Sequence, residues 1–328
     1  MVPTQRVLDS GGHAEPPERR ETVVCAIDLG SRNLKAVVGR VSGGEIVTRL
    51  LDKVRLDLGE HLDENGCSFS EAKIAEVRDA LDAVAARGRD EGASKVLAVG
   101  TRALREARNA GAVVRAARAA GVSFEIASGE REAELGYLCA TGGAPNRLVS
   151  DLGSRSLEIS WRTGNAFETR CVEPGYIDAY VAWFAGAPGF VEARDGYDAF
   201  LARRIHDLPG GTEQLLCLAS NTAASYVLGR PKAEVANRPL TRAALDSAMR
   251  RLERLAPAAW REHRDTTPRA EKILPGLVVL DRLMRGSGHR EAVVVEAELP
   301  VGLIVRHFVR WGGPWRIRSG QAGAQSGL

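Results

Sequence analysis

Two short segments of this chain share the same five residues, and this repeat constrains the fold more than any other feature. Residues 28–32 and residues 151–155 both read Asp-Leu-Gly-Ser-Arg. The first copy follows the apolar run 23–27, and the second follows the strand-like run 147–150. An apolar run that ends in a glycine turn is typical of a buried strand. The repeat therefore predicts two similar α/β lobes with a cleft between them.

The residue types in the repeat suit a site for phosphate and metal. A carboxylate such as Asp28 or Asp151 can hold Mg²⁺, directly or through water. Glycine lets the backbone turn closely enough to aim N–H groups at phosphate oxygens, and serine adds a neutral donor. One such turn is most often a plain turn. Two copies, separated in sequence by about the length of one lobe, favour a cleft that binds phosphate from two sides.

Length and composition agree with a globular protein of two domains. The chain has 328 residues, of which 44% are hydrophobic and 27% charged, and this length usually exceeds one hydrophobic core. The net charge of +3 argues against a surface that coats nucleic acid.

Five scattered cysteines without a CxxC pair predict reduced thiols. No run reaches the ~18 apolar residues that span a membrane, so we expect a cytoplasmic protein.

Apolar periodicity predicts strands and helices in both halves of the chain. Ser68 and Glu71 have the spacing of a capping box, which predicts that a long helix opens there. Strands are predicted at 23–27, 34–38, 45–50, 95–100, 124–127, 147–150, 157–161, 168–172 and 293–295. Further helices are predicted at 103–120, 129–139, 176–205, 222–228, 241–255 and 270–284.

In order along the chain, the motifs resemble those of the exopolyphosphatase/guanosine pentaphosphate phosphohydrolase (Ppx/GppA) family. The likeness runs from about Val24 to Ile304. The blocks that carry it are Ala26–Lys35, Val54–Leu56 with Gly59 and Gly66, Gly100–Asn109, Ser128–Ala133, Asp151–Glu158 and Gly175. Together these blocks are far more specific than any one of them.

The resemblance implies an α/β fold of two actin-like (ribonuclease H-like, ASKHA) lobes with an interdomain active-site cleft. We expect an N-terminal lobe at 21–138 and a C-terminal lobe at 139–316, whose last segment is able to pack back on the first lobe. Residues 1–20 lack the apolar core of a signal peptide and are expected to be a disordered tail, and residues 317–328 a flexible one. The length fits the short form of the family, without its C-terminal HD-type domain.

The resemblance also implies roles for single residues. Glu132 matches the general base that activates a water for attack on a terminal phosphorus. Arg105 matches an arginine that pairs with phosphate oxygens, which suits its planar fork. The other expected phosphate-binding residues are Gly30, Ser31, Arg32, Thr101, Gly153, Ser154, Arg155 and Ser156. The residues expected to hold the metal, Mg²⁺ or Mn²⁺, are Asp28, Asp151 and Glu158.

The chain departs from the family pattern within both turns and near its end. Arg32 replaces an asparagine of the first motif, and Ser154 and Arg155 replace two glycines of the second. Each arginine can offer its guanidinium to a phosphate or point to solvent, and the sequence leaves both open. Pro300 replaces a family arginine, which argues against long polyphosphate more than against phosphate binding. By residue type alone, Glu132 also fits a solvated helix face.

These features predict a metal-dependent phosphohydrolase of the Ppx/GppA type. Its substrate is polyphosphate, a guanosine pentaphosphate-like alarmone, or a small nucleoside or sugar phosphate in a specialised pathway. A degenerate sensor that binds phosphate or nucleotide without turnover is an alternative. A kinase of the same fold group ranks lower, because the glycine turn expected near residues 219–222 is eroded. We expect no nucleic-acid or membrane partner and leave a homodimer open.

Overall fold

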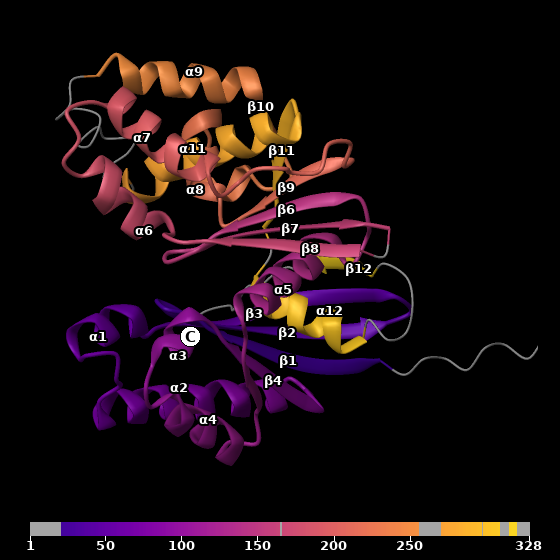
Figure 1. The fold of residues 1–328 in the computed structure, drawn as a ribbon. Helices are drawn as coiled ribbons and strands as arrows, with labels where there is room; N and C mark the ends of the chain where they lie inside the picture. Colours follow the sequence, from indigo (N-terminus) through magenta and orange to yellow (C-terminus); the bar gives the residue numbers. More distant parts are fainter. Residues whose placement is uncertain (1–20, 165, 256–269, 297, 309–314, 320–328) are drawn as a thin grey trace, which may run out of the picture.

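The computed structural model describes residues 21–164, 166–255, 270–296, 298–308 and 315–319. Two six-stranded sheets lie one above the other, with helices on their outer faces and further helices between them (Figure 1). The first sheet contains β1 Thr22–Leu29, β2 Asn33–Ser42, β3 Glu45–Arg55, β4 Lys95–Gly100, β5 Ser123–Ile126 and β12 Arg316–Ser319. The second contains β6 Arg147–Leu152, β7 Leu157–Thr163, β8 Ala166–Val172, β9 Gln214–Leu218, β10 Pro239–Thr241 and β11 Glu291–Val294.

The two sheets have the same internal topology. Their strand orders are β12-β3-β2-β1-β4-β5 and β10-β11-β9-β6-β7-β8. In the first, β1, β2 and β3 form an antiparallel meander, and β4 and β5 follow in parallel beside β1. In the second, β6, β7 and β8 repeat the meander, and β9 and β11 repeat the parallel pair. This is the strand order of a ribonuclease H-like lobe, so the predicted two-lobed α/β fold is confirmed.

The twin turns occupy equivalent places in the two sheets. Each connects the central strand of its sheet, β1 or β6, to the next strand of the meander. The N–H of Gly30 donates to the carbonyl of Asn33 over 3.0 Å, and the N–H of Gly153 donates to that of Ser156 over 2.9 Å. In α/β sheets, ligands bind beyond the carboxyl ends of the parallel strands. Both turns lie at such an end.

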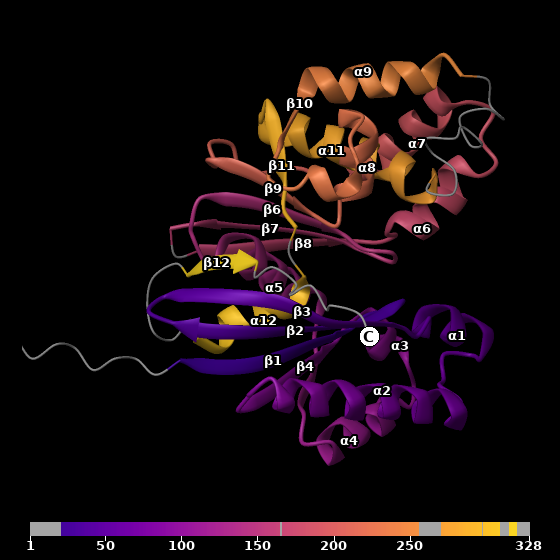
Figure 2. The same cartoon turned by 180° about the vertical axis from the view of Figure 1, so that it is seen from behind.

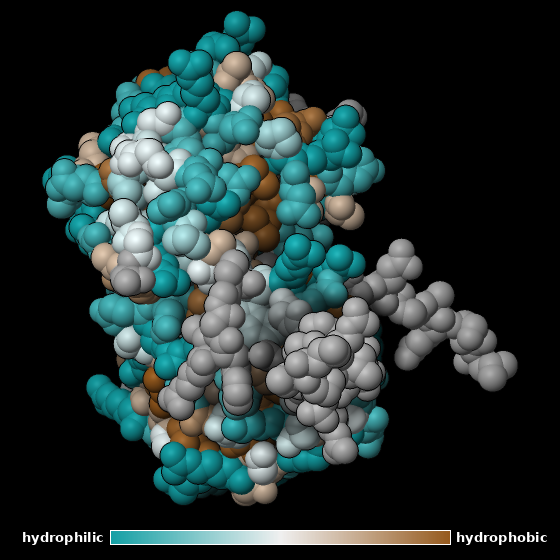
Figure 3. All heavy atoms as spheres, turned by 90° about the vertical axis from the view of Figure 1, so that its right-hand side faces the viewer, coloured by the Kyte–Doolittle hydropathy of each residue, from teal (hydrophilic) through white to brown (hydrophobic). Residues whose placement is uncertain are grey.

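The helices cover the sheets and connect their strands. They are α1 Leu58–Glu64, α2 Glu71–Asp90, α3 Arg102–Glu106, α4 Ala110–Ala119, α5 Gly129–Thr141, α6 Tyr176–Ala179, α7 Phe190–Ala202, α8 Asn221–Leu228, α9 Arg242–Glu253, α11 Ala270–Ser287 and α12 Leu299–Phe308, with short helical turns at Tyr180–Phe184 and Lys232–Glu234. Within the described part of the chain, no helix has the length and apolar character that crossing a membrane requires. On the face in Figure 3, the coloured surface is mostly hydrophilic.

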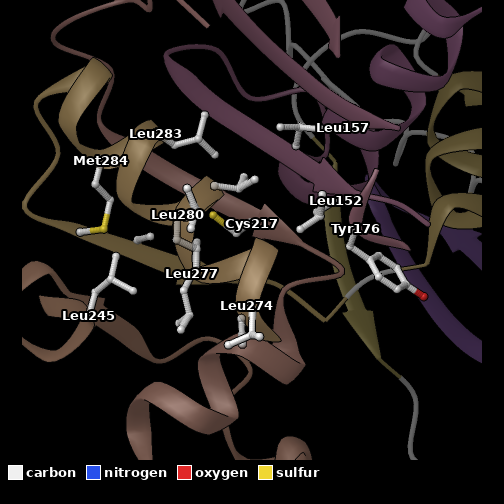
Figure 4. Packing of buried hydrophobic residues seen from close by; sticks show 14 of the residues in the cluster. Leu152, Leu157, Tyr176, Cys217, Leu245, Leu274, Leu277, Leu280, Leu283 and Met284 are labelled. Atoms are coloured by element: carbon white, nitrogen blue, oxygen red, sulfur yellow. The ribbon is translucent and has the colours of Figure 1, made fainter. Parts of the chain in front are cut away.

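Helices α5 and α12 lie between the two sheets and join them through a shared core (Figure 2). A Cβ at Gly302 of α12 would overlap the carbonyl of Leu135 in α5, so the two helices approach with no room for a side chain. A Cβ at Gly39 of β2 would lie 2.8 Å from a methyl carbon of Ile304. A separate core in the second lobe packs the leucines of α11 against β6 and β7 (Figure 4).

Several details differ from the sequence predictions. α1, β9 and α12 were not predicted, and the segment predicted as helical at 176–205 is divided into α6, a helical turn and α7. The single helix predicted at 103–120 is broken into α3 and α4, because the side chain of Asn109 exchanges two hydrogen bonds with the backbone of Phe69. Ser70 rather than Ser68 caps α2, and its hydroxyl accepts the N–H of Lys73 over 3.2 Å. The predicted flexible tail starts too early, since residues 317–319 belong to β12 beside β3. Residues 1–20 and 320–328 lie outside the described residues.

Candidate active site

A cavity of about 290 Å³ opens between the two lobes, and both twin turns line it. Its wall contains Asp28 and Asp151 from the ends of the two central strands, and Glu132 from α5. Eight of the expected phosphate-binding residues also line it, namely Gly30, Ser31, Arg32, Thr101, Gly153, Ser154, Arg155 and Ser156. The fold therefore brings three segments far apart in sequence to one cavity. Arg105 and Glu158 are not among the lining residues.

Asp28 and Asp151 form an acidic floor in this cavity. Burial raises the pKa of the Asp28 carboxyl to about 8 and that of Asp151 to about 6, and the nearby Glu132 acts in the same direction on both. One oxygen of Asp28, Oδ1, is buried without a hydrogen-bond partner. A buried carboxylate oxygen with no donor is costly unless a cation or a proton satisfies it.

Glu132 is held at the start of α5 by a cap and by an ion pair. The hydroxyl of Ser128 caps the helix by accepting the N–H of Arg131 over 3.2 Å. Arg105 donates through Nη1 to Oε2 of Glu132 over 2.8 Å and to the carbonyl of Ala127 over 2.9 Å. Burial raises the pKa of Glu132, while its hydrogen bond with Arg105 opposes that shift. Arg105 therefore orients the glutamate from behind the cavity wall.

Glu158 lies behind Asp151 and not on the cavity wall. The two residues face each other in the pairing of β6 with β7, and Glu158 is buried. The Sγ of Cys171 donates to its Oε1 over 3.6 Å. Burial raises the pKa of Glu158 well above its usual range, and the negative charges of Glu132 and Asp151 add to that. Glu158 extends the acidic character of the floor beneath Asp151.

The floor offers a divalent cation fewer ligands than a preformed metal cage would. Among the residues that the structure describes, no three His, Cys, Asp or Glu side chains form a group able to hold a metal ion. Mg²⁺ commonly binds to one or two carboxylates and completes its shell with water and substrate phosphates. Asp28, with its unpartnered oxygen, and Asp151 fit that kind of site.

The arginines of the twin turns are met by carboxylates. Arg32 lies 3.8 Å from Asp57 and 3.8 Å from Glu60. Arg155 forms an ion pair with Asp63 and lies 3.5 Å from Asp178. Three of the four carboxylates come from α1 or its N-terminal cap, so carboxylates of this helix lie beside both arginines. Asp57 is shared with Arg55, whose Nε lies 2.6 Å from its Oδ2.

Four lysines line the same cavity, and sequence reasoning did not assign them. They are Lys35 on β2, Lys53 on β3, Lys232 on the helical turn Lys232–Glu234 and Lys272 on α11. Lys35 forms an ion pair with Glu298. Burial acts to lower the pKa of Lys35, but the negative charges of Glu298 and Asp28 outweigh burial and raise it. Among the described residues, Lys53, Lys232 and Lys272 have no carboxylate within ion-pair distance. We call these three the lysine group.

Lys272 occupies the most confined position of the lysine group. Its ammonium lies 5.1 Å from the ring centre of Tyr176, which also lines the cavity. Burial lowers the pKa of Lys272 to about 8, and the positive charges of Lys232 and Lys35 lower it further. Such crowding of like charges is relieved when an anion binds between them. Only Lys35, inside the first family motif, carried a signal that sequence reasoning could have used.

The second turn is fixed from behind by the N-terminus of α6. The N–H of Tyr176 donates to the carbonyl of Gly153 over 3.0 Å, and that of Ile177 to the carbonyl of Ser154 over 3.1 Å. A Cβ at Gly175 would lie 2.5 Å from backbone atoms of Arg155, so only glycine permits this approach. The glycine at 175 therefore sets the position of the second turn.

Comparisons with known proteins agree with this fold. A family model described as the Ppx/GppA phosphatase family matches residues 37–292. The fold is similar to the crystal structure of the Ppx/GppA family member from Aquifex aeolicus, with a TM-score of 0.76 and 20% identity over 89% of this chain and 99% of that one. It is also similar to an exopolyphosphatase from Cytophaga hutchinsonii, with a TM-score of 0.68 and 16% identity over 87% of this chain and 97% of that one. The chain belongs to the Ppx/GppA phosphatase family, and it is a hydrolase that acts on phosphate bonds.

Proposed function

We propose that the protein is a metal-dependent phosphohydrolase that removes a terminal phosphate from a substrate carrying more than one phosphate group. The single observation that carries this proposal is the meeting of Glu132, Asp28 and Asp151 in one cavity that four lysines also line. The carboxylates supply a base and an acidic floor for a cation. The lysines supply more positive charge than one phosphate monoester needs.

In this proposal, Glu132 is the general base. Its carboxylate accepts the proton of a water as the water attacks the phosphorus. The raised pKa makes the carboxylate a stronger proton acceptor than an exposed glutamate. The ion pair with Arg105 keeps it ionised and fixes its orientation. Arg105 is then a positioning residue.

Asp28 and Asp151 are the residues proposed to hold Mg²⁺ or Mn²⁺, with Glu158 supporting Asp151 from the neighbouring strand. A bound divalent ion supplies neutralisation of the phosphate oxygens as the bond breaks. Occupation of the floor also lowers the pKa of both aspartates toward their usual range, because a nearby positive charge favours the ionised form.

The phosphate groups are proposed to bind along the two turns and the lysine group. Ser31 and Ser154 of the turns line the cavity, and their hydroxyls are the neutral donors of this proposal. Lys272 and Lys232 would receive phosphate groups beyond the one that reacts. This charge pattern favours a short phosphoanhydride over the small phosphate ester that remained an alternative from the sequence.

A substrate panel tests the proposal. Phosphate release is measured with Mg²⁺, with Mn²⁺ and with a chelator, for tripolyphosphate, long-chain polyphosphate, guanosine pentaphosphate, ATP and several phosphate monoesters. We expect release from at least one phosphoanhydride, loss of release with chelator, and little release from monoesters. Release from monoesters alone contradicts the assignment of substrate class. Tight binding without release from any compound identifies the sensor instead.

A further inference from the structure

Arg155 extends from the second lobe across to the first. Its guanidinium pairs with Asp63, the residue before the last of α1, and lies 3.5 Å from Asp178 at the start of α6. A Cβ placed on Gly59 would lie 3.5 Å from the Nε of Arg155 and 3.3 Å from the Cβ of Ser31. The guanidinium therefore lies against α1 and the first turn, although its backbone belongs to the second turn.

The backbone of Arg155 is held in place from two directions. Gly175 allows the start of α6 to approach Arg155 and Ser156 directly. Arg102 of α3 donates through Nη1 to the carbonyl of Arg155, and its other terminal nitrogen lies 3.4 Å from Glu173. Arg102 belongs to the first lobe and Glu173 to the second, so the bridge at Arg155 has a neighbour that also joins the lobes. The side chain of Arg155 is only 20% exposed.

The contacts of Arg155 leave it poorly suited to bind phosphate. A guanidinium has five N–H donors in one plane, and an arginine that grips phosphate presents two of them together. Here the two terminal nitrogens of Arg155 face Asp63 and Asp178. The rim that surrounds it is acidic, with Glu60 on the same helix α1. An anion at this point would meet carboxylates before it met a free cation.

We infer that Arg155 is a specificity-determining residue: its bridge to Asp63 closes the gap between the twin turns on the α1 side and makes the cleft blind there. This inference rests on the proposed function. A phosphate chain then enters by its end only, and it cannot thread through the gap over Ser31. A glycine at position 155 would have no side chain to fill that gap. Arg155 thereby limits how much of a phosphate chain the cavity accepts and in which positions along the cavity the chain can bind.

The test counts protein molecules bound to long-chain polyphosphate in the non-hydrolysing Glu132→Gln background, by light scattering at saturating protein with Mg²⁺ present. With the bridge intact we expect one molecule at each chain end, whatever the length of the chain. Arg155→Gly is expected to make the number bound grow with chain length. Because this change removes a positive charge, general electrostatic attraction cannot account for such a gain. A number that stays fixed at the ends in Arg155→Gly overturns the inference.

Two variants on α1 separate the bridge from the charge. Asp63→Asn removes the partner of Arg155, whereas Glu60→Gln removes an equal charge that pairs with Arg32. With Asp63→Asn, as with Arg155→Gly, the number of protein molecules bound is expected to grow with chain length. With Glu60→Gln, it is expected to stay at one molecule per chain end, as in the Glu132→Gln protein alone. Loss of all binding in Arg155→Gly with no effect of Asp63→Asn would make Arg155 a phosphate ligand and overturn the inference.

A measurement without ligand keeps the outcome separate from the proposed function. Thermal unfolding is measured for Arg155→Gly, Asp63→Asn and the double variant. If the two side chains bridge the lobes, the melting shift of the double variant is smaller than the sum of the single shifts. Additive shifts overturn the bridge. If no variant binds polyphosphate but the shifts in melting temperature are non-additive, the proposed substrate is refuted and the bridge between Arg155 and Asp63 is retained.

Discussion

Two groups of cations line the same cavity, and they differ in how the protein compensates them. Each arginine of the twin turns has two carboxylates beside it. The lysine group has no such partner among the described residues, and burial with mutual repulsion lowers the pKa of Lys272 to about 8. The difference leads us to propose that the pairing of a cation with carboxylates, more than its place beside the twin turns, decides whether it binds an anion. The uncompensated charge is the one available to an anion.

The largest effect is expected at Glu132, which lines the same cavity. Glu132→Gln keeps the shape and the hydrogen bond to Arg105 but removes the proton acceptor, so we expect kcat to fall by about 10²- to 10⁴-fold. KM should change little, since neither group of cations is altered. Steady-state phosphate release measures both constants. An unchanged kcat removes Glu132 as the base.

Substitution within the lysine group should come next. Lys272→Met keeps most of the length of the side chain and removes its charge. Loss of a charged hydrogen bond costs about 1.5–3 kcal/mol, which corresponds to about a 10- to 150-fold rise in the Kd for tripolyphosphate. The melting temperature should not fall, because the charged lysine is partly buried without a carboxylate partner among the described residues. Calorimetric binding of tripolyphosphate and thermal unfolding check the two results. Unchanged affinity contradicts the role of the lysine group.

The pH dependence of binding should also follow Lys272. Its pKa is lowered to about 8, so the ammonium is charged below that pH and increasingly neutral above it. Affinity for tripolyphosphate is therefore expected to fall as the pH rises through about 8, with the midpoint moved upward when the anion is bound. In Lys272→Met this loss should be absent or weaker. Titration of binding against pH in both proteins provides the comparison.

The smallest effect is expected at Arg32. Asp57 and Glu60 already lie 3.8 Å from its guanidinium, and exposed pairs of this kind contribute about 0–1 kcal/mol. Arg32→Ala should therefore change KM by no more than about 5-fold. A loss as large as that of Lys272→Met would reverse the comparison and make the arginine a phosphate ligand.

The fold and the centre of the candidate site follow from local sequence patterns. The repeat of Asp-Leu-Gly-Ser-Arg predicts two equivalent strand-turn units, because an apolar strand and a glycine turn are encoded within a few residues. The structure places Asp28, Asp151 and Glu132 on one cavity wall. Their roles as metal ligands and base stay predictions.

Other features depend on packing between distant segments and carry no local signal. Lys53, Lys232 and Lys272 are separated by long stretches of chain and meet only because β3, the helical turn at Lys232–Glu234 and α11 reach the same cavity. The compensation of Arg155 depends on where α1 packs against the opposite lobe. The break between α3 and α4 requires the contact of Asn109 with Phe69, which is 40 residues away. Periodicity within one segment contains none of this information.

The most direct test of the account is a crystal structure of the Glu132→Gln variant with tripolyphosphate and Mg²⁺. We predict a terminal phosphate between the twin turns beside residue 132, the cation on Asp28 and Asp151, and a further phosphate in contact with Lys272. Arg155 should remain on Asp63. A phosphate chain held by Arg32 and Arg155, with the lysine group untouched, would contradict the account.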